Sequence, residues 1–205
     1  MLPKAAAEMT GPRRKWPASL LAATVLVAVT APACTDTPTE AASPAALGLS
    51  PWTDRARVVF DDNIEPAAVG YTMDVPPARG DKFLRERALS ADLVSRLRVQ
   101  TVTVETIGDD STYHLGVQVA TPTLAPNPKI QEKTLELVIK ATTPAYGIAK
   151  ALDQRMQGLT FIGFVSRFAS ADGTEIELHW HLAPDTADVA EAVKEAVALA
   201  EASGR

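Results

Sequence analysis

In the stretch "ADLVSRLRVQTVTVE", residues 91–105, apolar side chains alternate as they do in a half-buried β-strand. Leu97 and Val99 share one parity, whereas Val102 and Val104 share the other. A change of parity within one strand predicts a β-bulge, which redirects the face of the strand and is common where sheets curl. We therefore expect a bent strand in a curled sheet.

The segments around this strand predict a fold of the α+β class that is mostly β. Alternating patterns predict further strands at 113–119, 135–140 and 175–182, and a largely apolar run predicts another at 161–168. Residues 55–60 could form a short strand. Asp172-Gly173 is a hairpin signal between the last two strands. Helices are expected at 81–93, 143–157 and 185–202, the last of them capped by Asp185 or Thr186. The central order is therefore three strands, a helix and two strands, with a helix on either side.

This order and the bulged first strand resemble the five-stranded OB-type barrel. Residues 91–105, "YHLGVQV" (113–119) and "GLTFIGFV" (158–165) resemble the netrin-like or metalloproteinase-inhibitor-like branch of these barrels, and uncharacterised bacterial secreted proteins of that sort. The resemblance covers about residues 91–183, and a different α+β sandwich is the alternative. Inhibitors of this kind act through an N-terminal cysteine braced by disulfides. Cys34 is the only cysteine and lies more than fifty residues before the barrel, so inhibition is not implied.

The first 33 residues have the pattern of a secretory signal peptide, with a basic start, an uncharged apolar run at 19–31 and small residues before Cys34. Ala31-Pro32-Ala33-Cys34 resembles the lipobox of bacterial lipoproteins, although that family usually has leucine at the first position and tolerates proline poorly at the second. The resemblance implies a diacylated Cys34 and contact with a membrane through that lipid. Ordinary cleavage after Ala33, giving a soluble secreted or periplasmic protein, is the alternative.

The residues after Cys34 predict a tether followed by one domain. Residues 34–50 lack aromatic side chains and are rich in Thr, Pro, Ser and Ala, which is typical of a flexible linker. Residues 51–205 have the length of a single globular domain. Thr35, rather than aspartate, follows the cysteine, which resembles lipoproteins sorted to the outer membrane of bacteria with two membranes.

The charge balance argues against nucleic acid as a partner. Residues 1–33 contain four of the 20 basic and one of the 25 acidic residues, so the rest of the chain has 16 against 24, a net charge of −8. Binding to nucleic acid depends on basic patches. We expect a partner protein of the cell envelope instead.

The strongest candidate for chemistry is "EIELHWHLA", residues 175–183. On a strand, Glu177, His179 and His181 project from one face because side chains alternate. With His114 from the second strand, if the two strands are neighbours, they could bind zinc. The alternative is a solvated sheet face backed by the buried side chains of Ile176, Leu178, Trp180 and Leu182.

Other catalytic signatures are missing from the sequence. It contains no G-x-S-x-G elbow, phosphate loop, H-E-x-x-H or dinucleotide fingerprint. Asp61-Asp62 and Asp109-Asp110 are best interpreted as turn residues. Trp52 is either a cap on the core or an exposed contact for a partner. Together these features favour a lipid-anchored binding or interaction module of the cell envelope without catalytic activity. A zinc-binding secreted protein and a protease-inhibitor-like barrel are the alternatives.

Overall fold

The computed structural model describes residues 44–72 and 78–204. The predicted signal peptide, Cys34 and the first part of the predicted linker lie outside these residues. No helix among the described residues is long and apolar enough to cross a membrane.

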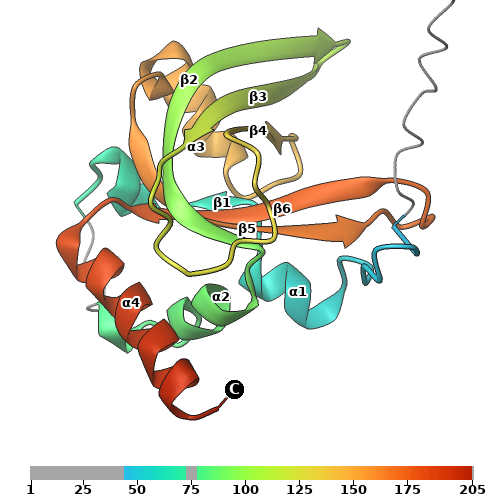
Figure 1. Cartoon of the computed structure of the whole chain (residues 1–205). Coiled ribbons are helices and arrows are strands. Elements are labelled where there is room, and N and C mark those ends of the chain that lie inside the picture. Colours follow the sequence, from blue (N-terminus) through green and yellow to red (C-terminus); the bar gives the residue numbers. More distant parts are fainter. Residues whose placement is uncertain (1–43, 73–77, 205) are drawn as a thin grey trace, which may run out of the picture. The chain divides into compact units, whose positions relative to one another are not determined.

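Six strands in the described part of the chain form one mixed sheet that curls into a half-barrel (Figure 1). Their order across the sheet is β1-β6-β5-β2-β3-β4. Neighbours are antiparallel except for β1, which runs parallel to β6. The strands are β1 (Asn63–Ile64), β2 (Leu93–Ile107), β3 (Asp110–Val119), β4 (Thr134–Ile139), β5 (Thr160–Ala169) and β6 (Ile176–Pro184).

The bulge predicted in β2 is confirmed. The register with β3 shifts between Val99 and Thr101, which leaves Gln100 as the extra residue. Leu97 and Val99 before the shift are buried, and so is Val102 after it. The bulge thus keeps the apolar residues of both halves on the same side of a strand that bends visibly in Figure 1.

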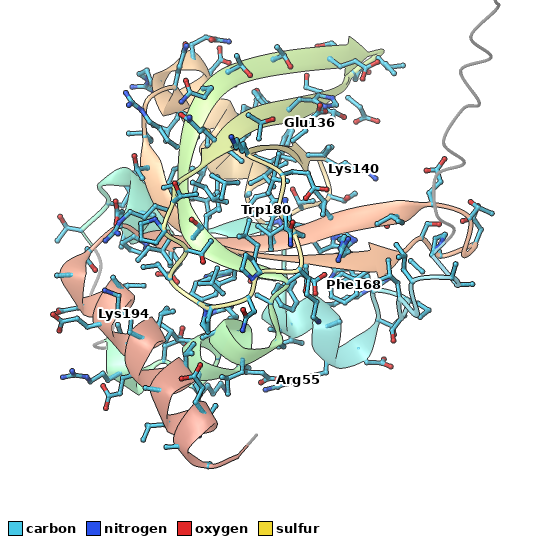
Figure 2. All side chains as sticks on the ribbon, viewed as in Figure 1. Arg55, Glu136, Lys140, Phe168, Trp180 and Lys194 are labelled. Atoms are coloured by element: carbon cyan, nitrogen blue, oxygen red, sulfur yellow. The ribbon has the colours of Figure 1, made fainter. Side chains whose placement is uncertain are left out.

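The sheet buries a core on each of its faces. The concave face holds large side chains such as Leu97, Phe161 and Trp180, each fully buried; Trp180 lies near the middle of the molecule in Figure 2. The opposite face packs Ile162 and Phe164 against the helices. Each large apolar side chain buried in this way contributes about 1.5–3 kcal/mol, so the two cores stabilise the domain without a disulfide.

Four α-helices are present among the described residues: α1 (Asp54–Val59), α2 (Leu84–Ser90), α3 (Tyr146–Leu152) and α4 (Ala187–Ala202). Short 3-10 helices lie at Pro66–Val69, Ala78–Gly80 and Asp153–Met156. The hydroxyl of Thr186 accepts a hydrogen bond from the backbone N–H of Val189 at 3.3 Å, which confirms one of the two predicted caps of α4.

Three expectations need correction. Residues 55–60 form most of helix α1 rather than a strand, because Ala56, Val59 and Phe60 have the i, i+3, i+4 spacing that turns them together toward the core. The sheet has six strands rather than five, because the two residues of β1 add an edge strand that is too short to leave a pattern. The predicted helix at 143–157 is also interrupted, since Asp153 adopts a positive φ of 45°.

Candidate functional site

The site is built where the segment "DDNIE", residues 61–65, runs beside β6. Asn63 is in register with His181, and the N–H groups of Asp62 and Glu65 donate to the carbonyls of Trp180 and Leu182, each at 2.9 Å. This parallel pairing brings three carboxylates of one short segment to the outer face of β6. That face carries both histidines of the strand.

His181 is held between two of these carboxylates. Its Nδ1 lies 2.8 Å from Oδ1 of Asp61, and its Nε2 lies 2.9 Å from Oε1 of Glu65. A neutral imidazole has a single N–H, so only the protonated ring donates to both. Burial lowers the pKa of His181, but the hydrogen bonds to Asp61 and Glu65 raise it more, and the net effect is a raised pKa. The two bonds and the raised pKa both favour the imidazolium form of this buried side chain, with 3% of the residue exposed.

His179 is held in a similar way, with an aromatic partner added. Its Nδ1 lies 2.8 Å from Oδ2 of Asp62, and its Nε2 lies 3.4 Å from Oε2 of Glu177. The ring of Trp52 stacks on the imidazole with centroids 3.6 Å apart and planes 5° from parallel. The guanidinium of Arg57 in turn lies over the ring of Trp52, 5.0 Å from its centroid. Trp52 is thus both a cap and part of the site.

Asp62 has a second role that explains its burial. Its Oδ1 accepts the backbone N–H of Trp180 at 3.1 Å while Oδ2 faces His179. Only 5% of the residue is exposed, and its φ is +48°. One carboxylate therefore completes the hydrogen bonding of the β6 edge and fixes the orientation of an imidazole.

A cavity of about 630 Å³ opens beside these residues, between β6 and the far edge of the sheet at β4. Such a volume is in the range of small-ligand pockets. Glu136 and Lys140, both marked in Figure 2, come from β4 and the residue just after it. The wall is formed by Trp52, Arg57, Asp61, Asp62, Glu136, Val138, Lys140, Thr142, Thr143, Pro144, Ile176, Glu177, Leu178 and His179.

Every carboxylate that lines this cavity is bonded to a histidine. Asp61 holds His181, while Asp62 and Glu177 hold His179. Glu136 lies 2.5 Å from Nδ1 of His114, whose Nε2 is 3.7 Å from Glu105. The three histidines of the chain are therefore all bound to carboxylates of one cavity.

The two basic side chains that line the cavity, Arg57 and Lys140, are not bonded to an ionisable partner in this way within the described part of the chain. Arg57 donates from Nε to the backbone carbonyl of Trp52. Lys140 is exposed on the opposite wall. Neither forms an ion pair with a carboxylate among residues 44–72 and 78–204. The cavity therefore offers two basic side chains that are not engaged by a carboxylate among the described residues.

The residues predicted from the sequence are brought together only in part. Glu177 and His179 meet at the cavity wall, and His181 lies next to them on β6. His114 is on β3, with β2 and β5 between it and β6 in the sheet, so the condition of neighbouring strands is not met. Within the described residues no three His, Cys, Asp or Glu side chains form a metal-binding group. Zinc binding stays a prediction.

The interpretation of this strand face as a solvated one was wrong at its centre. His179 is 8% exposed and His181 is 3% exposed, because Trp52 stacks on His179 and the 61–65 segment lies beside both. Sequence reasoning also missed Asp61, Asp62 and Glu65, which it assigned to a turn or ignored. Three carboxylates within five residues were a signal, but their partners lie more than a hundred residues away.

Comparison with known proteins adds no further constraint, since no protein-family model, curated protein or solved structure matches this chain.

Proposed function

We propose that this protein is a non-catalytic binding module of the bacterial cell envelope and that the cavity beside His179 is its ligand site. The observation that carries the proposal is the charge arrangement of the cavity. Its four carboxylates each face a histidine, whereas Arg57 and Lys140 are free of carboxylate partners within the described residues. A wall of this kind favours a ligand with an anionic group.

The bonding of the histidines supports binding rather than catalysis. A general base needs a ring nitrogen within reach of a substrate proton. Both nitrogens of His181 face carboxylates at 2.8 and 2.9 Å, and both nitrogens of His179 face carboxylates at 2.8 and 3.4 Å. The hydrogen bonds of these rings hold the walls of the cavity in place.

Anchoring through a lipid on Cys34 is the second part of the proposal. It is supported by the lipobox-like residues 31–34, by the linker at 34–50 and by the absence of any other cysteine in the sequence. Two acyl chains suffice for stable attachment to a membrane. In a bacterium with two membranes, Thr35 favours the outer one. The finer assignment of the curled sheet, as an OB-type barrel extended by β1, belongs to the same proposal.

Photocrosslinking in the native envelope tests the ligand site. A photoreactive amino acid replaces Thr142, an exposed residue of the cavity wall, and in a control replaces Lys194, an exposed residue of α4 (Figure 2). We expect an envelope component to be captured from position 142 and not from position 194. Equal capture at both positions, or none at 142, would contradict the proposal. The intact mass of the N-terminal peptide from the same preparation shows whether Cys34 carries diacylglycerol.

A zinc-binding protein is the second candidate, because Glu177 and His179 meet at the cavity wall. It predicts stoichiometric zinc in the purified protein, lost when both His179 and His181 are replaced by alanine. Zinc content that is unchanged in this double variant would contradict it. Protease inhibition rests on the barrel-like fold alone, which is a weak basis for function, and direct inhibition assays would test it.

A further inference from the structure

The β4 edge of the sheet leaves backbone groups without a strand partner among the described residues. The N–H of Val119 donates to the carbonyl of Lys133 at 2.9 Å, which marks this pair as hydrogen-bonded in the β3–β4 ladder. Bonded and non-bonded pairs alternate in antiparallel sheets. The backbone groups of Leu135 and Leu137 are therefore directed to β3. Those of Glu136 and Val138 are directed outward.

The first residues of β6 also have backbone groups without a strand partner among the described residues. The N–H of Ser170 donates to the carbonyl of Glu175, so odd-numbered residues of β6 direct their backbone groups to β5. On the other edge, β1 pairs with β6 only at His181 and Leu182. Asp62 occupies the adjoining position by bonding both backbone groups of Trp180. Beyond this point, Leu178 and Ile176 are the next residues whose backbone groups face outward.

All four residues with outward-facing backbone groups line the same cavity. Glu136 and Val138 contribute to one wall, and Ile176 and Leu178 contribute to the other. Free strand edges normally invite pairing with another chain, and natural proteins block them unless pairing is wanted. Here Asp62 blocks the edge of β6 at Trp180, while the stretch beside the cavity is left open.

We propose that the open edge of β6 binds an extended segment of a partner polypeptide, added as a strand alongside Ile176 and Leu178, with an acidic side chain directed to Lys140. This inference rests on the proposed role of the cavity as a ligand site and specifies the class of ligand. Backbone hydrogen bonds to the edge provide affinity, and the side chains of the segment provide selectivity, as in other cases of strand addition. Lys140 and Arg57, which form no ion pair with a carboxylate among the described residues, are available to bond an acidic side chain of the segment.

The segment would extend the line of β1. It would lie on the same edge of β6 that β1 uses, and its first open position follows the carboxylate of Asp62. Side chains of alternate residues would then lie over Leu178, which packs against the inner core, and over the outer wall formed by Trp52 and His179. An alternating segment with one apolar face and one acidic face matches both sides.

Selection from a random decapeptide library, displayed on phage and panned against the full-length protein, identifies a binding sequence. We expect enriched peptides to alternate in polarity and to contain aspartate or glutamate. For the best peptide, Lys140→Gln should weaken binding about five- to tenfold, whereas the control Lys194→Gln on α4 should leave it unchanged. Enrichment of peptides without an acidic residue, or of none, would overturn the proposal.

N-methylation of the selected peptide tests strand pairing without changing the protein. Methyl groups on alternate amides in one register should weaken binding at least tenfold, because they remove the hydrogen bonds to the edge. The same number of methyl groups in the other register should be tolerated. Equal effects of the two registers would overturn strand addition. Capture of a lipid or sugar from position 142, with no enriched peptide, would overturn this inference alone and leave the proposed ligand site standing.

Discussion

Replacing His181 by glutamine should remove a pH dependence of stability that the wild-type protein shows above neutral pH. The pKa of His181 is raised in the folded protein because its hydrogen bonds to Asp61 and Glu65 outweigh its burial. The unfolded chain has the ordinary value of about 6.5. The folded state therefore binds more protons between these two values. The stabilisation from His181 is complete below pH ~6.5 and is lost as pH rises through the raised pKa.

The size of the effect follows from the two bonds. A hydrogen bond to a charged group contributes about 1.5–3 kcal/mol, and His181 makes two of them, at 2.8 and 2.9 Å. The side chains of Asp61 and Glu65 are 28% and 26% exposed, so water recovers part of the loss in the variant. We expect His181→Gln to lower the free energy of unfolding by about 3 kcal/mol at pH 6. Once the pH has passed the raised pKa of His181, the difference should fall to about 1 kcal/mol.

Urea denaturation of the full-length protein, followed by tryptophan fluorescence at several pH values between 5.5 and 9.5, measures this difference. His114→Gln is the matched control, because His114 also lies between two carboxylates but its partners Glu105 and Glu136 are largely exposed. Exposed pairs of this kind contribute about 1 kcal/mol or less. Parallel stability curves for the wild type and His181→Gln would refute the assignment of His181 as a buried imidazolium.

Three further substitutions test the packing of the sheet and the stability of two helices. Gly163→Ala should destabilise the protein by about 1–3 kcal/mol in thermal or urea denaturation, because the added Cβ would lie 2.7 Å from Cγ of the fully buried Leu97. Gly147→Ala, in α3, should instead stabilise it by about 0.5–1 kcal/mol, because no atom lies within 4 Å of the added carbon. Thr186→Ala should cost about 1 kcal/mol through loss of the cap on Val189, while Thr186→Ser should be close to neutral.

The parts of the fold that local patterns control were predictable. The parity switch between Val99 and Val102 predicted the bulge of β2, which the register with β3 confirms. The signal at Asp172-Gly173 correctly placed a hairpin between β5 and β6. The prediction of a strand at 55–60 was wrong. Two adjacent valines favour a strand locally, whereas packing of Ala56, Val59 and Phe60 on one side stabilises a helix.

Only part of the site could be predicted, because the acidic partners of the two histidines lie far from them in the sequence. The common face of Glu177, His179 and His181 follows from the period of a strand, and β6 presents them so. Their acidic partners depend on the parallel pairing of the two-residue strand β1 with β6. No local pattern predicts such a pairing. The third predicted histidine, His114, was placed with the others on the assumption of neighbouring strands, and the order of the sheet separates them.

The buried carboxylate–imidazole pairs also account for how so short a strand keeps its register. The backbone bonds from Asp62 and Glu65 to β6 would be kept nearly as well after a shift along the strand, because backbone groups are alike at every position. The side chains are not alike: a shift of the 61–65 segment by one residue would move Asp62 away from His179 and leave a buried charge without a partner. Breaking a buried pair in this way costs about 3–5 kcal/mol. The pairs thus fix the register of the 61–65 segment on β6. In this register Trp52 stacks on His179, and the adjoining edge of β6 stays open at Leu178.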